Sequence, residues 1–448
     1  MPQPIARRCV VYFAGFDPNG SSHYHRKYKS QAALQSAVSG YSLQVGDRQK
    51  IGPHLSTWAV KFSPLPAPTP TQDAANTTHT DYVFAQWDDI VRAHWSRMGT
   101  LGEKWRWLQT FLATQWFFIQ NGAVLRMLRL AWPPVVALVA PLLLFMAALV
   151  AALATPVIGW WGLAAWGVTH AAPLGQKLAL AMAIGLVMAG LLIAVVRNLE
   201  RKFHMLWLMR SYIFTYQQAH GLVPGLDARM QEFASFIRGA VDGGQYDEVL
   251  VVGHSSGAIM ATAALAFAQS GAQPGVPSGV PSGVPSGAQP GALYKLPDSQ
   301  VAPRTTAVGL VTLGQCIPML SSVSTATVYR AQLKLIAQSN SMTWVDFCAP
   351  SDGCCFAFVD ATALPDGTNS VYTSQPKLLS PRLQTLFSPA DYHQLCRHRF
   401  DLHFQYVHAG NLPGDYDYFA ITAGPLDLHS RYAAAHSVTD YKKFSLFS

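Results

Sequence analysis

The chain has 448 residues, of which half are hydrophobic and only 12% are charged. This charged fraction is about half the value usual for soluble globular proteins, so we expect part of the surface not to face water. The net charge of +8 is spread along the chain without the clustered basic face that nucleic-acid binding requires. Basic residues beside apolar runs predict contact with anionic lipid headgroups instead, and nucleic acid is not an expected partner.

The cysteines are too few for a disulfide framework and lack the paired CxxC motifs of a zinc site, which predicts reduced thiols in a cytosolic compartment. They are Cys9, Cys316, Cys348, Cys354, Cys355 and Cys396. His23 and His25 alternate in a polar segment without the carboxylate or thiol partners that zinc needs. We therefore expect no metal and no other cofactor.

Short apolar runs and helical patterns alternate along the chain, which is typical of the α/β class, a mostly parallel sheet flanked by helices. The N-terminal run is a poor signal peptide and is interpreted as the first core strand. Expected strands are residues 9–14, 58–62, 82–85, 249–252, 308–313, 343–347 and 418–422. Expected helices include residues 88–95, 227–240 and 258–268, where apolar residues recur at helical spacing.

Two long uncharged runs, residues 132–166 and 178–196, predict an inserted two-helix transmembrane hairpin, because one span needs about 20 apolar residues. Basic residues flank the outer ends of both runs, so the positive-inside rule places those ends in the cytoplasm. The expected protein is a multi-pass membrane protein anchored in the lipid bilayer, with its main domain on the cytoplasmic side of the inner membrane. The alternative is a helical pair buried in a large core.

Residues 270–293 repeat a Gly-Val-Pro-Ser unit and are too poor in apolar residues to order themselves, which predicts a flexible insertion. The transmembrane hairpin at 126–202 and this insertion would divide one domain into three segments. The segments are residues 1–125, 203–269 and 294–448.

The strongest local signal is DEVLVVGHSSGAIMATAALAFA, an apolar strand that runs through Gly253-His254-Ser255-Ser256-Gly257 into an Ala-rich helix. In a GxSxG elbow of this kind, the glycines permit a sharp turn that exposes the central serine above the sheet. The pattern predicts Ser255 as a nucleophile and the backbone N–H of Ser256 as an oxyanion donor. A serine-capped Gly-rich turn is the structural alternative, and His254 is interpreted as a packing residue.

Three motifs together resemble the α/β-hydrolase superfamily: VLVVGHSSG, VVYFAGFDPNG at the first strand, and VTLGQCIP after the nucleophile helix. Within it, the chain resembles uncharacterised bacterial membrane-anchored serine hydrolases. The resemblance implies an acid and then a histidine following the serine in sequence. It also implies a second oxyanion donor in the loop at residues 15–20, for which we expect the Phe16 N–H; an ordinary turn is the alternative.

By the same resemblance, the acid follows a strand after the nucleophile helix. Asp352 comes just past the expected strand 343–347 and is the preferred candidate. Asp346 lies within that strand and Asp360 lies further along the chain. A Ser-Asp-Gly turn explains Asp352 without catalysis.

The histidine of the superfamily commonly follows the last core strand, which we expect at 418–422. His429 lies in the segment after it and is preferred over His436, which is expected on a helix. His403 and His408 precede this strand and are interpreted as structural or peripheral.

The order Ser255, Asp352, His429 is the order that the fold requires. The predicted function is a membrane-anchored serine hydrolase of lipase or esterase type, which cleaves lipophilic acyl esters through an acyl-enzyme. A thioesterase or acyltransferase with the same triad is an alternative, as is a non-catalytic membrane scaffold.

Overall fold

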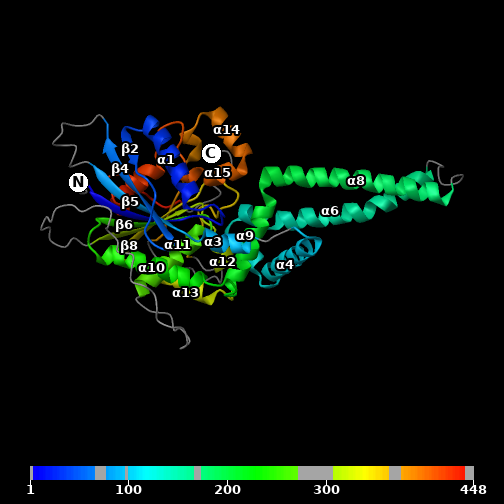
Figure 1. The fold of residues 1–448 in the computed structure, drawn as a ribbon, viewed down its shortest axis with the longest axis horizontal. Coiled ribbons are helices and arrows are strands. Elements are labelled where there is room, and N and C mark those ends of the chain that lie inside the picture. The colour runs from blue at the N-terminus through cyan, green and yellow to red at the C-terminus, as the bar shows by residue number, and fades with distance from the viewer. Residues whose placement is uncertain are drawn as a thin grey trace.

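One mixed β-sheet organises the computed structural model, which describes residues 4–65, 77–95, 99–165, 173–270, 306–362 and 375–438 (Figure 1). The strand order is β2-β4-β5-β1-β6-β7-β8-β9, with β3 paired to β4. The strands are β1 (Arg7–Phe13), β2 (Tyr41–Val45), β3 (Gln49–Lys50), β4 (Leu55–Pro64), β5 (Thr78–Ala85), β6 (Glu248–His254), β7 (Ala307–Leu313), β8 (Met342–Phe347) and β9 (Lys377–Leu379). From β5 to β9 all pairings are parallel, whereas β2, β3 and β4 pair antiparallel.

The central strand β1 is buried on both faces of the sheet. Cys9, Val11 and Phe13 belong to the hydrophobic core on one face, and Val10 and Tyr12 belong to the core on the other. This alternation follows from the two-residue period of a strand. A strand that is apolar on both sides therefore sits in the middle of the sheet, as parallel strands usually do.

Helices cover both faces. The first core includes residues of α3 (Asp88–His94), α9 (Met205–Ala219), α10 (Leu226–Asp242), α11 (Gly257–Ser270), α12 (Ile317–Ser321) and α13 (Thr327–Ala337). The second includes residues of α1 (Ser21–Val38), η1 (Leu383–Leu386), α15 (Arg399–Phe404), η2 (Gln405–Val407), α16 (Tyr418–Ala423) and α17 (Leu428–Tyr432). The helix α14 (Pro389–Arg397) packs beside α15 and buries none of its own residues.

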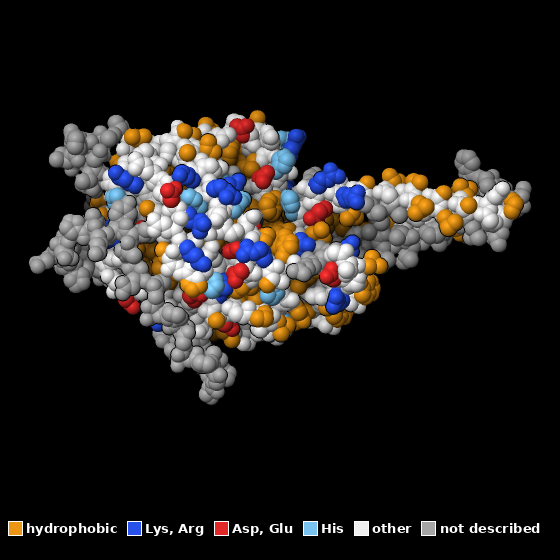
Figure 2. Space-filling view, viewed as in Figure 1, with side chains coloured by type: hydrophobic (Ala, Val, Ile, Leu, Met, Phe, Trp, Pro, Cys, Tyr) orange, Lys and Arg blue, Asp and Glu red, His pale blue; other side chains and the backbone are white. Residues whose placement is uncertain are grey.

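A helical hairpin is inserted between β5 and β6. It follows α4 (Leu101–Gln120) and α5 (Ala123–Leu130), and consists of α6 (Trp132–Ala165) and α8 (Leu174–Phe203). The two long helices pack against each other and extend away from the α/β body (Figures 1 and 2). The near end of α6 is part of the body, because Val135 and Leu138 are buried in the first hydrophobic core.

The prediction of a transmembrane hairpin is wrong. Among the described residues, no helix combines the length and the apolar character needed to cross a membrane. Part of the first apolar run belongs to the protein core, since Val135 and Leu138 of α6 pack there. The fold is therefore a mixed sheet flanked by helices with an inserted helical hairpin, and the predicted localisation as a two-span membrane protein is wrong as well.

One expected strand is a helix. Residues 418–422 lie in α16, because the Asp417 carboxylate caps this helix by accepting hydrogen bonds from the N–H groups of Phe419 and Ala420 at 3.0 and 2.9 Å. Nearly every α16 side chain is buried, so its apolar run has the same pattern as a core strand. The predicted repeat insertion lies almost wholly outside the described residues.

Candidate active site

Ser255 stands at a sharp turn between β6 and α11. Its φ of 56° lies in the left-handed region, which is uncommon for a residue with a side chain and strained outside special turns. The Ser255 N–H donates to the Leu313 carbonyl at 2.8 Å, so the end of β7 helps to hold the turn. The backbone thereby lifts the serine hydroxyl above the carboxyl end of the sheet.

The two glycines of the motif are required by close backbone approach. A Cβ atom at Gly257 would lie 2.2 Å from the Phe13 carbonyl oxygen and 2.5 Å from that of Ala14. A Cβ atom at Gly253 would lie 2.6 Å from the Cα of Ala258. Strand β1 and helix α11 therefore pack closely enough around the turn that only glycine fits.

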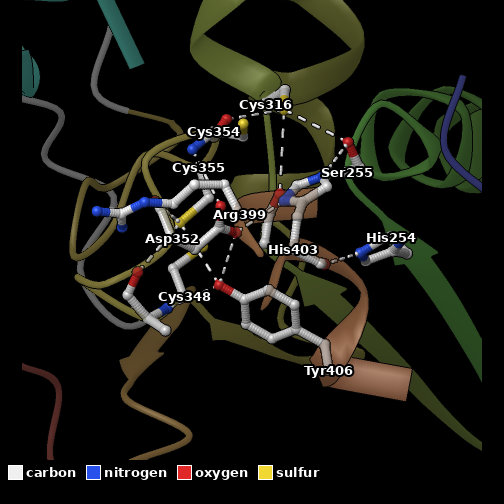
Figure 3. A network of polar contacts seen from close by, with 12 residues as sticks. His254, Ser255, Cys316, Cys348, Asp352, Cys354, Cys355, Arg399, His403 and Tyr406 are labelled. Carbon is white, nitrogen blue, oxygen red and sulfur yellow. Dashed lines mark hydrogen bonds and ion pairs between the residues drawn. The ribbon is translucent and has the colours of Figure 1, made fainter. Parts of the chain in front are cut away.

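A chain of hydrogen bonds joins Ser255 to His403 and Asp352 (Figure 3). The His403 Nε2 atom lies 2.9 Å from Ser255 Oγ, and its Nδ1 atom lies 2.8 Å from Asp352 Oδ2. A carboxylate only accepts hydrogen bonds, so it selects the tautomer with the proton on Nδ1, and Nε2 is left to accept from the serine hydroxyl. All three side chains are buried. Their hydrogen-bonded order is that of the nucleophile, base and carboxylate in a serine hydrolase.

The Asp352 carboxylate is held in its ionised form. Burial raises its pKa, but the opposing effects of His403 and of the hydrogen bonds outweigh burial, and the pKa lies below its ordinary value. Oδ1 accepts from the Cys354 N–H at 3.0 Å, and Oδ2 accepts from the Tyr406 hydroxyl at 3.0 Å. The Tyr406 hydroxyl in turn accepts from the Ala349 N–H at 2.9 Å, so the loop after β8 is fixed around the carboxylate.

The loop after β1 and the residue after Ser255 supply the two candidate oxyanion donors. The loop after β1 passes close to the elbow, since a Cβ atom at Gly15 would lie 3.1 Å from Ser255 Cβ and 3.5 Å from Ser255 Oγ. Within the described part of the chain, neither the Phe16 N–H nor the Ser256 N–H donates a hydrogen bond to a protein acceptor. These donors belong to the positions expected for an oxyanion hole.

Neighbouring aromatic residues hold both the loop and the histidine. The Trp207 indole N–H donates to the Phe16 carbonyl at 2.7 Å. The His254 Nε2–H donates to the His403 carbonyl at 2.8 Å, while burial lowers the pKa of His254 to about 3 and keeps its ring neutral. His254 therefore positions the segment that carries His403 and does not contact the serine hydroxyl as a base.

Sulfur atoms also line the site. Cys316 Sγ lies 3.7 Å from Ser255 Oγ, and burial raises its thiol pKa to about 12, so this thiol stays protonated and is a poor nucleophile.

Among the described residues, Asp352, Cys354 and His403 have ligating atoms within 4.8 Å of one another and could hold a metal ion. Two of these three are already paired with each other, and burial raises the pKa of the Cys354 thiol well above its usual range.

The structure does not bring His429 to the site, and this prediction is corrected to His403. His429 is exposed on α17, and its Nδ1 lies 3.4 Å from the Thr343 hydroxyl near the start of β8. Ser255 follows the carboxyl end of β6, whereas Thr343 lies near the amino end of β8, which runs parallel to β6 in the same sheet. The opposite end of a strand of six or seven residues is roughly 20 Å away, too far for proton transfer.

The other candidates also lie apart from the serine. Asp346 is buried on β8, where its Oδ1 accepts from the Thr312 hydroxyl at 2.6 Å. Asp360 accepts hydrogen bonds from the N–H and hydroxyl of Thr362 two residues later, which is a local turn. His436 is exposed and lies in a loop instead of a helix.

His403 precedes residues 418–422, the segment expected to be the last core strand, whereas the histidine is expected after that strand. Its position after Asp352 satisfies the order serine, acid, histidine as well as that of His429 does. A signal that could have found it is Asp417, a good helix-capping residue directly before the supposed strand.

No family model, no curated protein and no solved structure gives a significant match to this chain.

Proposed function

We propose that this protein is a serine hydrolase that cleaves carboxylic esters through an acyl-enzyme formed on Ser255. The observation that carries the proposal is the hydrogen-bonded chain from Asp352 through His403 to the strained Ser255, with distances of 2.8 and 2.9 Å. The resemblance of the elbow and its neighbouring motifs to the α/β-hydrolase superfamily supports the same reading.

In the proposed mechanism, His403 Nε2 takes the proton of the Ser255 hydroxyl as its oxygen attacks the acyl carbonyl. The Asp352 carboxylate keeps the imidazole oriented and stabilises the imidazolium that forms. The Phe16 and Ser256 N–H groups donate to the oxyanion of the tetrahedral intermediate. His403 then protonates the leaving alkoxide, and a water molecule activated by the same nitrogen releases the acid and restores the serine.

The lipophilic character of the substrate was inferred from a membrane location, and that argument no longer applies. The leaving group can be an alcohol or a thiol, because the triad and the oxyanion donors act on the acyl carbonyl in both cases.

The test is covalent labelling of purified protein with a fluorophosphonate probe, followed by hydrolysis of 4-nitrophenyl esters with acyl chains of increasing length. We expect labelling and hydrolysis by the native chain, and loss of both in Ser255→Ala at an unchanged melting temperature. Cys316→Ser is the matched control, because it alters a neighbouring side chain 3.7 Å from the hydroxyl and should keep the label. A folded native protein that takes no label contradicts the proposal.

A further inference from the structure

A cavity of about 470 Å³ lies where the base of the hairpin meets α14 and α15. Figure 2 shows Lys, Arg and His side chains gathered in this part of the surface. The charged and titratable side chains of its lining come from two distant parts of the chain: Arg201, His204, Arg397, His398 and Asp401. Two arginines and one aspartate give the lining a net positive charge.

The two arginines of the lining are exposed, and Asp401 lines the same cavity. Among the described side chains, neither Arg201 nor Arg397 forms an ion pair or a hydrogen bond. Guanidinium groups bind carboxylate and phosphate oxygens through paired, charge-assisted hydrogen bonds. Two such groups at one cavity are suited to an anion.

The cavity adjoins the helix that carries His403, and aromatic side chains connect the two. Phe400 lines the cavity and precedes His403 by three residues on α15, so both side chains lie on the same side of this helix. The Trp207 ring packs against both, with centroids 5.3 Å from Phe400 and 6.3 Å from His403. Trp207 also donates to the carbonyl of Phe16, the residue of the proposed oxyanion hole.

His204 also lines this cavity. It is the joint between α8 and α9 and has a φ of 47°, a left-handed conformation that is rare for a residue other than glycine. Its ring packs against Phe400 with centroids 4.5 Å apart. This conformation caps the C-terminus of α8, where the His204 N–H donates to the Glu200 carbonyl at 2.8 Å, and it leaves the ring at the cavity.

We propose that this cavity, with Arg201 and Arg397 as its principal ligands, binds an anionic group of the ester substrate, a carboxylate or a phosphate. This inference rests on the proposed hydrolase function, because it makes the cavity a subsite of the Ser255 site. The substrate class is then an acyl ester or thioester that carries a negative charge outside the scissile bond.

The first experiment measures binding of inorganic phosphate and of acetate by calorimetry, without any reaction. The native chain is compared with the double variant Arg201→Gln, Arg397→Gln, and with Arg26→Gln, which removes an exposed arginine on α1 outside the cavity lining. We expect the double variant to bind the preferred anion at least about tenfold more weakly than the native chain, and Arg26→Gln to bind it normally. The anion that binds more tightly identifies the group.

The second experiment measures kcat/KM for phenyl butyrate and for its 4-carboxy and 4-phosphate derivatives. We expect the double variant to lose about tenfold on the preferred anionic ester and to keep its rate on the neutral one. The subsite is overturned if the ratio of kcat/KM on the anionic ester to kcat/KM on the neutral ester is the same in the native chain and in the double variant. Anion binding that depends on the arginines, in a native chain that hydrolyses no ester, overturns the hydrolase function and the subsite role while leaving an anion site.

Discussion

The turn that carries Ser255 and the segment that carries His403 come together where Ser255 Oγ lies 2.9 Å from His403 Nε2. Different kinds of contact hold the two in place. The turn is fixed locally, by two glycines within five residues and by the strands on either side. His403 is fixed by distant parts of the chain: the second core, in which its neighbour Leu402 packs, the His254 ring at its carbonyl, and Asp352 at Nδ1. A local motif can therefore be identified from sequence, whereas its histidine partner depends on tertiary packing.

The largest expected effect separates the two candidate acids. Asp352→Asn leaves the shape of the site but removes the acceptor that selects the tautomer of His403, so we expect kcat to fall by about 10⁴-fold. Asp346→Asn should change kcat less than about threefold, because this side chain bonds to Thr312 and not to the histidine. Steady-state kinetics on one ester decides between them, and the reverse ranking would move the acid to β8.

The turn itself is tested by Gly257→Ala. The added methyl group would meet the carbonyl oxygens of Phe13 and Ala14 at 2.2 and 2.5 Å, so the backbone must shift. We expect a loss of more than about 4 kcal/mol in the free energy of unfolding, measured by urea denaturation. Gly353→Ala is the control near the other half of the site, since a Cβ atom there meets nothing within 4 Å. Equal stabilities of the two variants would contradict the close packing of β1 and α11.

Asp346 also predicts a pH dependence of stability. Burial raises its pKa to about 7 from the ordinary 3.8, so the folded state holds this proton more tightly than the unfolded state does. The protonated Asp346 carboxyl contributes its full stability below pH 3.8, and this contribution is lost as the pH rises through about 7. Asp346→Asn should therefore raise the free energy of unfolding on the order of 3 kcal/mol at pH 8 and have little effect at pH 4. A variant that is less stable than the native chain at pH 8 would refute this.

The smallest effect concerns the support of the acid. Tyr406→Phe removes the hydroxyl that donates to Asp352 and accepts from the Ala349 N–H, while the ring stays packed in the core. We expect kcat to fall by about tenfold with KM unchanged. Tyr416→Phe is the control, because its hydroxyl donates to the Tyr406 carbonyl and not to the acid. A control that loses as much activity would point to general loosening of the core.

The parts of the fold that could be predicted are those with local causes. The strands that became β1 and β6 contain unbroken apolar runs, those that became β7 and β8 are mostly apolar, and the elbow has its glycines beside the serine. Asp352 could be placed because it closely follows β8. In each case the residues that decide the structure are neighbours in sequence.

The rest depended on what surrounds each segment. The apolar run of α16 fits either a buried strand or a buried helix, and the choice is made by the Asp417 cap and by packing on the second core. The apolar run of α6 was assigned wholly to lipid, although Leu138 packs into the protein core. The error at α16 displaced the histidine from His403 to His429, so a single local misassignment moved one of the three site residues.

The most direct test of the central claim is the rate of fluorophosphonate labelling in His403→Ala and His429→Ala, each checked for folding by its melting temperature. His403 is 2.9 Å from Ser255 Oγ, whereas His429 lies at the opposite end of the sheet beside Thr343. We predict that His403→Ala slows labelling by at least about 10³-fold and that His429→Ala labels at the native rate. Native labelling in a folded His403→Ala, or its loss in His429→Ala, would contradict the triad of Ser255, His403 and Asp352.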